Sequence, residues 1–168
     1  MIGLFALTLL TFASPTADSA FLAAKRQAAK TDRNVLVYFR ASWCPWCRRM
    51  ERLFERPELQ TFWKKNYVIV PITMRERGDL VKTENKGWAE LMRRLRGRAD
   101  QDVPYLAIVS STGRTLVGSY QASATIPSNA GFPATPKELN AFIKMIRQTS
   151  KPLNSDERKI RLAVSALL

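Results

Sequence analysis

The chain has two cysteines, Cys44 and Cys47, and both belong to one short motif, Cys-Pro-Trp-Cys. The motif follows residues 35–39, an apolar run of β-branched and aromatic side chains that is typical of a buried strand. After the motif, Met50 and Leu53 lie at helical spacing. The cysteine pair is therefore predicted to lie where a buried strand passes into a helix.

This placement has chemical consequences for the two sulfurs. A helix start presents unpaired N–H groups and the positive end of the helix dipole, which stabilise a thiolate. The pKa of a cysteine in such a place falls from about 8.5 into the range of roughly 3.5–7.5. Pro45 suits the first turn, where its missing N–H has no partner to lose, and Arg48 and Arg49 add positive charge. The setting favours redox chemistry, with Cys47 able to reach Cys44 once a helical turn forms.

Two other interpretations of the pair stay open, a copper or zinc carrier and a pair of inert buried thiols. The chain has no histidine, which excludes His-based acid–base catalysis and His-ligated metals. A structural zinc site usually needs four ligands, so zinc would require carboxylates or a second chain. We therefore expect no metal site, and we favour the redox interpretation.

The net charge of +13 is large and raises the question of an anionic partner. Basic residues within 75–98 are interleaved with acidic ones rather than forming one block. They are not accompanied by an aromatic RNA-binding motif. We favour a solvated basic surface and expect no nucleic acid, while a protein whose basic face binds anionic polymers remains an alternative function.

The first thirteen residues are apolar and are followed by a small, polar, turn-prone stretch. This is the pattern of a signal-peptide core and a cleavage zone, although no Lys or Arg precedes it. The run is shorter than the about 20 residues of a membrane span. We predict a signal peptide over residues 1–19, a mature start between Ser14 and Phe21, and a periplasmic or otherwise exported protein. A buried first element and an uncleaved membrane anchor are the alternatives.

The rest of the chain alternates between helical and strand patterns. Strands are expected at 67–74, 105–109 and 115–120, the last two joined by a turn as a hairpin. Helices are expected at 20–30, capped by Asp18 or Ser19, and at 46–56, 58–66, 87–97, 135–148 and 151–168. Pro57 ends or kinks one helix, Gly97 ends another, Thr135 and Glu138 form a capping box, and Asn154 or Ser155 caps the last helix.

The segment VLVYFRASWCPWCRRM resembles the active-site segment of thioredoxin-fold proteins, in which a strand, a tryptophan, CxxC and a helix follow one another. The segment DVPYLAIVSSTGRTLVGSY resembles the second half of that fold, with Pro104 at its cis-proline and Gly113 at its turn glycine. The resemblance covers about Ala20 to Tyr120. It is strongest to the exported bacterial thiol–disulfide interchange proteins.

The resemblance implies an α/β chain with a thioredoxin-like fold, that is, a central mixed β-sheet flanked by helices. The expected domain spans residues 20–150, and residues 151–168 add a C-terminal helix. The implied activity is that of a protein-disulfide oxidoreductase, with a slight preference for a reductase. Such an enzyme needs no cofactor other than the redox-active disulfide Cys44–Cys47. The implied partners are protein disulfide or dithiol substrates and a redox partner protein, and we expect a monomer without a stable membrane span after processing.

The resemblance also assigns roles to residues. Cys44, at the exposed start of the helix, attacks or is attacked, and Cys47 resolves the mixed disulfide. Pro104 offers strand-like hydrogen bonds to an extended substrate and keeps metals from the pair. The remaining substrate-binding or supporting positions are Trp43, Pro45, Trp46 and Val103, with the two tryptophans as an apolar rim.

Three departures from thioredoxin stand out. Thioredoxin has a buried carboxylate six residues before its first cysteine, where this chain has Tyr38. The span from Cys47 to Pro104 is longer, with the extra length in the charged segment 75–102. The helix from about Asn154 is an addition.

Overall fold

The computed structural model describes residues 14–97, 102–120, 129–153 and 155–168, and the N-terminal run and Asn154 lie outside them. The strands are β1 (Asn34–Arg40), β2 (Tyr67–Thr73), β3 (Tyr105–Val109) and β4 (Thr115–Gly118). The helices are α1 (Ala17–Lys30), α2 (Pro45–Glu55), α3 (Pro57–Asn66), the 3-10 helix η1 (Gly78–Thr83), α4 (Trp88–Arg96), α5 (Pro136–Thr149) and α6 (Asp156–Ser165).

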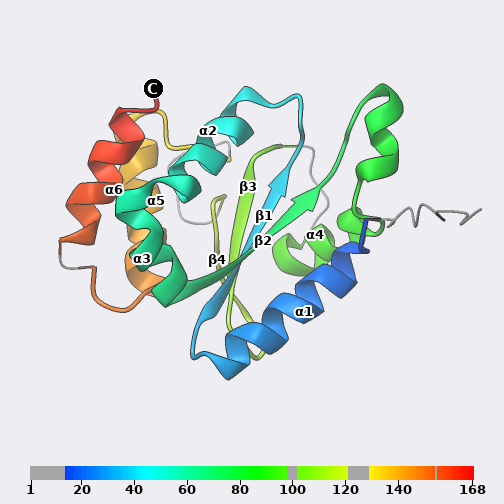
Figure 1. Ribbon diagram of the computed structural model, residues 1–168, viewed down its shortest axis with the longest axis horizontal. Helices are drawn as coiled ribbons and strands as arrows, with labels where there is room; N and C mark the ends of the chain where they lie inside the picture. The colour runs from blue at the N-terminus through cyan, green and yellow to red at the C-terminus, as the bar shows by residue number, and fades with distance from the viewer. Residues whose placement is uncertain (1–13, 98–101, 121–128, 154) are drawn as a thin grey trace, which may run out of the picture.

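The strands form one mixed sheet in the order β2-β1-β3-β4. β1 pairs in parallel with β2 and antiparallel with β3, and β3 pairs antiparallel with β4. β1 is thus an inner strand with hydrogen-bonded neighbours on both sides, which explains its nearly continuous run of apolar residues. Its C-terminal end points toward the start of α2 (Figure 1).

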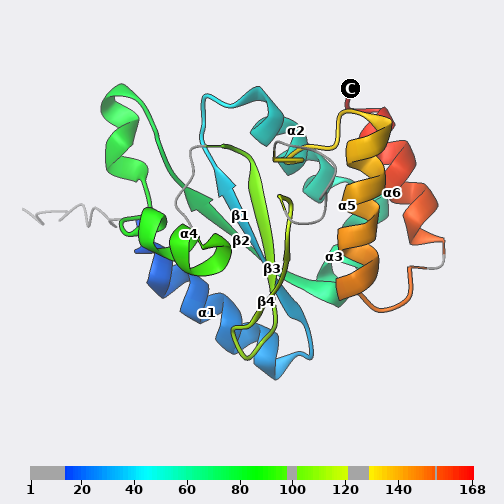
Figure 2. The same ribbon diagram turned by 180° about the vertical axis from the view of Figure 1, so that it is seen from behind.

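Helices cover both faces of the sheet. α2, α3, α5 and α6 lie on one face, and α1 and α4 lie on the other, as the two opposite views show (Figures 1 and 2). Successive side chains of β1 alternate between the two cores: Leu36 and Tyr38 pack on the α2 side, and Val37 and Phe39 pack on the α1 side. The structure confirms a central mixed sheet flanked by helices with an added C-terminal helix, α6.

Several local predictions are confirmed. Thr135 and Glu138 form the capping box of α5, with both reciprocal hydrogen bonds present. Pro57 separates α2 from α3 and occupies the start of α3. Gly97 ends α4 with a φ of 86°, a left-handed conformation that glycine adopts at no steric cost. Ser155 is the N-cap residue of α6, although its side chain makes no capping hydrogen bond.

Other local predictions were wrong. The N-cap of α1 is Thr16, whose Oγ1 accepts from the N–H of Ser19 at 3.1 Å, so Asp18 and Ser19 lie inside the first turn. β2 ends at Thr73 and β4 ends at Gly118, both earlier than expected. Directly after β4, the Ser119 hydroxyl accepts a hydrogen bond from the N–H of Leu106. The 3-10 helix η1 was not expected, because its short run carries no helical periodicity.

Candidate functional site

Cys44 is the N-cap residue of α2, and Pro45 occupies the first helical position. A tight turn after β1 sets Cys44 there, because its N–H donates to the carbonyl oxygen of Ala41. The Cys44 Sγ accepts a hydrogen bond from the N–H of Cys47 at 3.1 Å, as a capping side chain does. The structure therefore confirms that the pair stands between a buried strand and a helix, and both cysteines carry free thiols.

The expected exposure of Cys44 was wrong. Its exposed fraction is 2%, and that of Cys47 is 0%. The Cys44 Sγ lies 3.5 Å from the carbonyl oxygen of Val103 and belongs to a core cluster that includes Phe132. Sequence spacing places a residue at a helix start, but it does not indicate which distant segments cover that start.

The two thiols differ in acidity. The pKa of Cys44 is lowered to about 7, mainly by the hydrogen bond from the Cys47 thiol and further by backbone N–H groups and by Arg48. The pKa of Cys47 is raised, chiefly by that same hydrogen bond and by burial. Near neutral pH Cys44 is therefore partly ionised, while Cys47 keeps its proton.

A groove of about 450 Å³ lies beside the pair. Its lining comes from the cysteine loop, the start of β3 and the segment before α5, and consists of Trp43, Trp46, Asp102, Val103, Pro104, Asn129, Gly131, Phe132, Ala134 and Glu138. The structure thus brings together four of the five expected supporting residues, while Pro45 is the first residue of α2. The Asn129 and Phe132 contributions were missed, because they come from a loop without periodicity.

The Val103–Pro104 peptide bond is cis, as the resemblance implied. The carbonyl oxygen of Pro104 accepts a hydrogen bond from Asn129 Nδ2 at 2.6 Å. A Cβ on Gly131 would lie 2.2 Å from that oxygen, so only glycine allows this close approach. Asn129 and Gly131 therefore lie against Pro104, and the Pro104 carbonyl oxygen, an expected hydrogen-bond acceptor for an extended substrate, already has an internal partner.

The two tryptophans lie at the groove in different settings. Trp46 is 42% exposed and stacks on Phe132, with ring centroids 5.8 Å apart and planes at 21°. Trp43 is half-buried and donates from Nε1 to the carbonyl oxygen of Arg75 at 2.6 Å. The Arg77 guanidinium lies 4.3 Å from the Trp43 ring centroid. Both rings form part of an aromatic rim, and Trp43 also ties the cysteine loop to the segment after β2.

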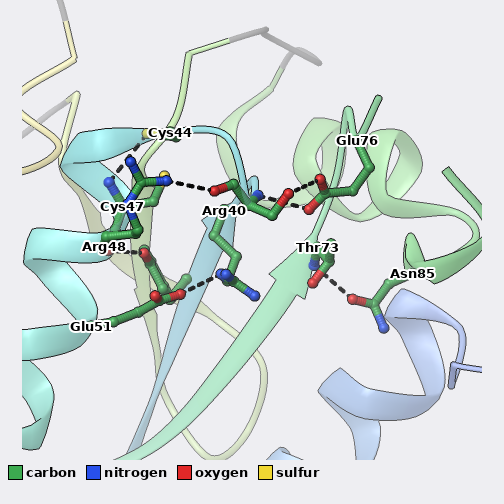
Figure 3. A network of polar contacts seen from close by, with 10 residues as sticks. Arg40, Cys44, Cys47, Arg48, Glu51, Thr73, Glu76 and Asn85 are labelled. Carbon is green, nitrogen blue, oxygen red and sulfur yellow. Dashed lines mark hydrogen bonds and ion pairs between the residues drawn. The ribbon is translucent and has the colours of Figure 1, made fainter. Parts of the chain in front are cut away.

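That segment also holds the cysteine loop through a buried carboxylate. Glu76 is 7% exposed and accepts hydrogen bonds from both the backbone N–H (2.8 Å) and the hydroxyl of Ser42, two residues before Cys44. Figure 3 shows Glu76 facing this loop, while Arg48 donates to the Ser42 carbonyl from the other side. Sequence reasoning missed Glu76, because it resembles the solvated charges around it.

We expect Glu76→Ala to destabilise the protein by about 1–3 kcal/mol, because it leaves two part-buried donors of Ser42 without their acceptor. Urea unfolding of the two proteins measures the difference. Glu55→Ala, at an exposed position of α2, is the matched control and should leave the midpoint unchanged. Equal midpoints for Glu76→Ala and the wild type would contradict the prediction.

Among the described side chains, no group of three or more His, Cys, Asp or Glu residues could hold a metal ion. The two sulfurs are the donors that a soft metal would use here.

Comparisons with known proteins support the thioredoxin-like fold. A family model described as thioredoxin-like matches residues 16–111, more than half of the chain. A disulphide isomerase from Xylella fastidiosa Temecula1 is 16% identical, with 96% of each chain covered and a TM-score of 0.53. A DsbH oxidoreductase is 16% identical over 89% of this chain and 93% of its own, with a TM-score of 0.46.

The C-terminal domain of Neisseria meningitidis DsbD, in its oxidised form, is 21% identical over 63% of this chain and 87% of its own, with a TM-score of 0.40. No curated protein matches the chain. At these identities a likeness shows fold and not activity, and the Xylella structure supports the fold that the family model indicates.

Proposed function

Because the chain belongs to the thioredoxin-like family, we propose that it is a thiol–disulfide oxidoreductase that exchanges electrons with protein disulfides through Cys44 and Cys47. The observation that carries the proposal is the unequal acidity of the two thiols beside an open groove. The pKa of Cys44 is about 7, whereas that of Cys47 is raised. In such a pair Cys44 can act as the nucleophile near neutral pH, while Cys47 stays protonated until the resolving step.

The proposed reaction has two steps. The Cys44 thiolate attacks one sulfur of a client disulfide, forms a mixed disulfide and releases the other client sulfur as a thiolate. The Cys47 sulfur, after losing its proton, then attacks Cys44 Sγ, and the client's remaining sulfur leaves. Two electrons pass from the protein to the client, and the Cys44–Cys47 disulfide is formed.

The groove supports an extended client segment beside Cys44. The carbonyl oxygen of Val103 lies 3.5 Å from Cys44 Sγ, where it can accept from a client backbone N–H once the thiol is consumed. The rings of Trp43, Trp46 and Phe132 offer apolar contacts. Since clients have to reach a buried sulfur, we expect exposed, flexible disulfides to be preferred.

A reductase is the direction that the Cys44 pKa favours. A strong oxidant of this superfamily stabilises its thiolate far more, with a pKa near 3.5, whereas thioredoxin has a value of about 7. Measuring the reduction potential of the purified protein against glutathione tests the proposal. A potential near about −270 mV supports a reductase, and one near −120 mV supports an oxidant. Stoichiometric copper or zinc binding without thiol exchange would instead support the metal carrier.

We further propose that the protein is exported. Among the described residues, the structure contains no helix long and apolar enough to cross a membrane. An oxidising compartment suits a protein whose clients carry disulfides.

We predict that the mature chain begins between Ser14 and Phe21, and intact-mass analysis of protein from the native host measures this. The carbonyl oxygen of Pro15 accepts from Asn85 Nδ2 at 2.7 Å, and the N–H of Ala17 donates to the carbonyl oxygen of Lys86 at 2.9 Å. These contacts favour a cut at the start of that range. Soluble cytoplasmic protein that retains Met1 would contradict both the cleavage and the export.

A further inference from the structure

The hydroxyl group of Tyr38 is buried beside the resolving cysteine. Tyr38 is 2% exposed, and its Oη donates a 2.7 Å hydrogen bond to the carbonyl oxygen of Cys47. Its ring packs edge-on against Phe54, with centroids 5.6 Å apart and planes at 80°. The phenol therefore has a fixed position under the first turn of α2.

Charged groups lie near the same position. Arg40, two residues further along β1, forms an ion pair with Glu51, which is one turn beyond Cys47 on α2 (Figure 3). Both side chains are partly exposed, at 26% and 29%. In the described part of the chain, the charged or titratable groups that act on Tyr38 are Cys47, Glu51 and Arg40.

Tyr38 is a hydrogen-bond donor at working pH and not a base. Its pKa is raised well above the usual value, first by burial and then by the electrostatic effects of the neighbouring Cys47 and Glu51, while Arg40 acts in the opposite direction. Its hydroxyl lowers the pKa of Cys47, against the larger upward effects of Cys44 and burial. The proton thus stays on the phenol while the O–H bond remains available to a nearby thiolate.

We infer that Tyr38 is a positioning residue that turns its hydroxyl from the Cys47 carbonyl to the Cys47 sulfur as that sulfur becomes a thiolate. It does so at the position where thioredoxin has a carboxylate, and the inference rests on the oxidoreductase function proposed above. In the resolving step the Cys47–Cys44 S–S bond forms and the Cys44–client S–S bond breaks. The Cys47 proton is lost to solvent before the attack, the client sulfur leaves as a thiolate, and Tyr38 neither gains nor loses a proton.

A chromogenic aromatic disulfide (a dithiobis-nitrobenzoate) separates the two steps in one stopped-flow trace. Attack by Cys44 releases one coloured thiolate, and resolution by Cys47 releases the second. We expect Tyr38→Phe to leave the first phase within about twofold of the wild type and to slow the second by at least about tenfold, the effect of removing a hydrogen bond to a charged group. The pH midpoint of the second phase should rise by about one unit, while that of the first phase stays unchanged.

Tyr67→Phe is the matched control. It removes another buried tyrosine hydroxyl, bonded to Thr149 Oγ1 at 2.8 Å, and should change neither phase. Cys47→Ser should lose the second phase, which identifies that phase as the resolving step and the first phase as attack by Cys44. An unchanged second phase in Tyr38→Phe, or equal slowing of both phases, overturns the role of Tyr38. A wild type that releases no coloured thiolate overturns the oxidoreductase function itself.

Discussion

Cys44→Ser is expected to abolish thiol–disulfide exchange, whereas Cys47→Ser is expected to keep the attack and lose the resolving step. The reason is the unequal acidity of the two thiols. Cys44 has the lowered pKa, about 7, and the capping position that stabilises its thiolate, whereas the Cys47 pKa is raised. Without Cys44 the remaining thiol is fully buried, out of reach of a client disulfide, so attack on a disulfide stops.

Cys47→Ser should therefore accumulate mixed disulfides with client proteins. The measurement is a non-reducing gel after acid quenching in an exporting host, with each band identified by mass. Reductant-sensitive adducts on Cys47→Ser and none on Cys44→Ser are the expected result. The double variant controls for adducts formed without the pair. If both single variants are adduct-free while the wild type binds copper or zinc stoichiometrically, the metal-carrier function replaces the proposal.

The local parts of this site could be predicted from the sequence because their causes are local. A β-branched run followed by CxxC and a proline indicates a strand, a reactive pair and a helix start within about a dozen residues. The capping box at Thr135 and Glu138 is local for the same reason, since both partners lie in one turn. The family resemblance added the cis bond before Pro104, which sequence patterns alone do not indicate.

The features that the sequence did not predict depend on contacts between segments that are distant in the chain. Cys44 is buried because Val103 and the Phe132 cluster approach it across the fold, and helical spacing carries no information about them. Glu76 resembles its charged neighbours until the fold places it against Ser42. Tyr38 was visible as a missing carboxylate, but only the structure shows that its hydroxyl bonds to Cys47. Polar groups that act through tertiary contacts have no periodic signature.

The same electrostatics predict how attack depends on pH. The thiolate is the nucleophile, so the attack rate follows the deprotonated fraction of Cys44, which falls as pH drops below the pKa of about 7. Between pH 5 and pH 8 the rate should rise by about 90-fold and then level off. An ordinary thiol with a pKa of about 8.5 would keep gaining reactivity above pH 8. Initial rates of iodoacetamide alkylation across this range measure the midpoint, and no levelling below pH 9 would contradict it.

The cause of the low midpoint can be tested with the same assay. Because the hydrogen bond from Cys47 is the largest effect and the charge of Arg48 the smallest, Cys47→Ala should raise the midpoint more than Arg48→Gln does. Cys44→Ser should react slowly throughout, since its remaining thiol is fully buried and burial disfavours its thiolate. A larger shift from Arg48→Gln than from Cys47→Ala would mean that nearby positive charge, rather than the partner thiol, makes Cys44 the nucleophile.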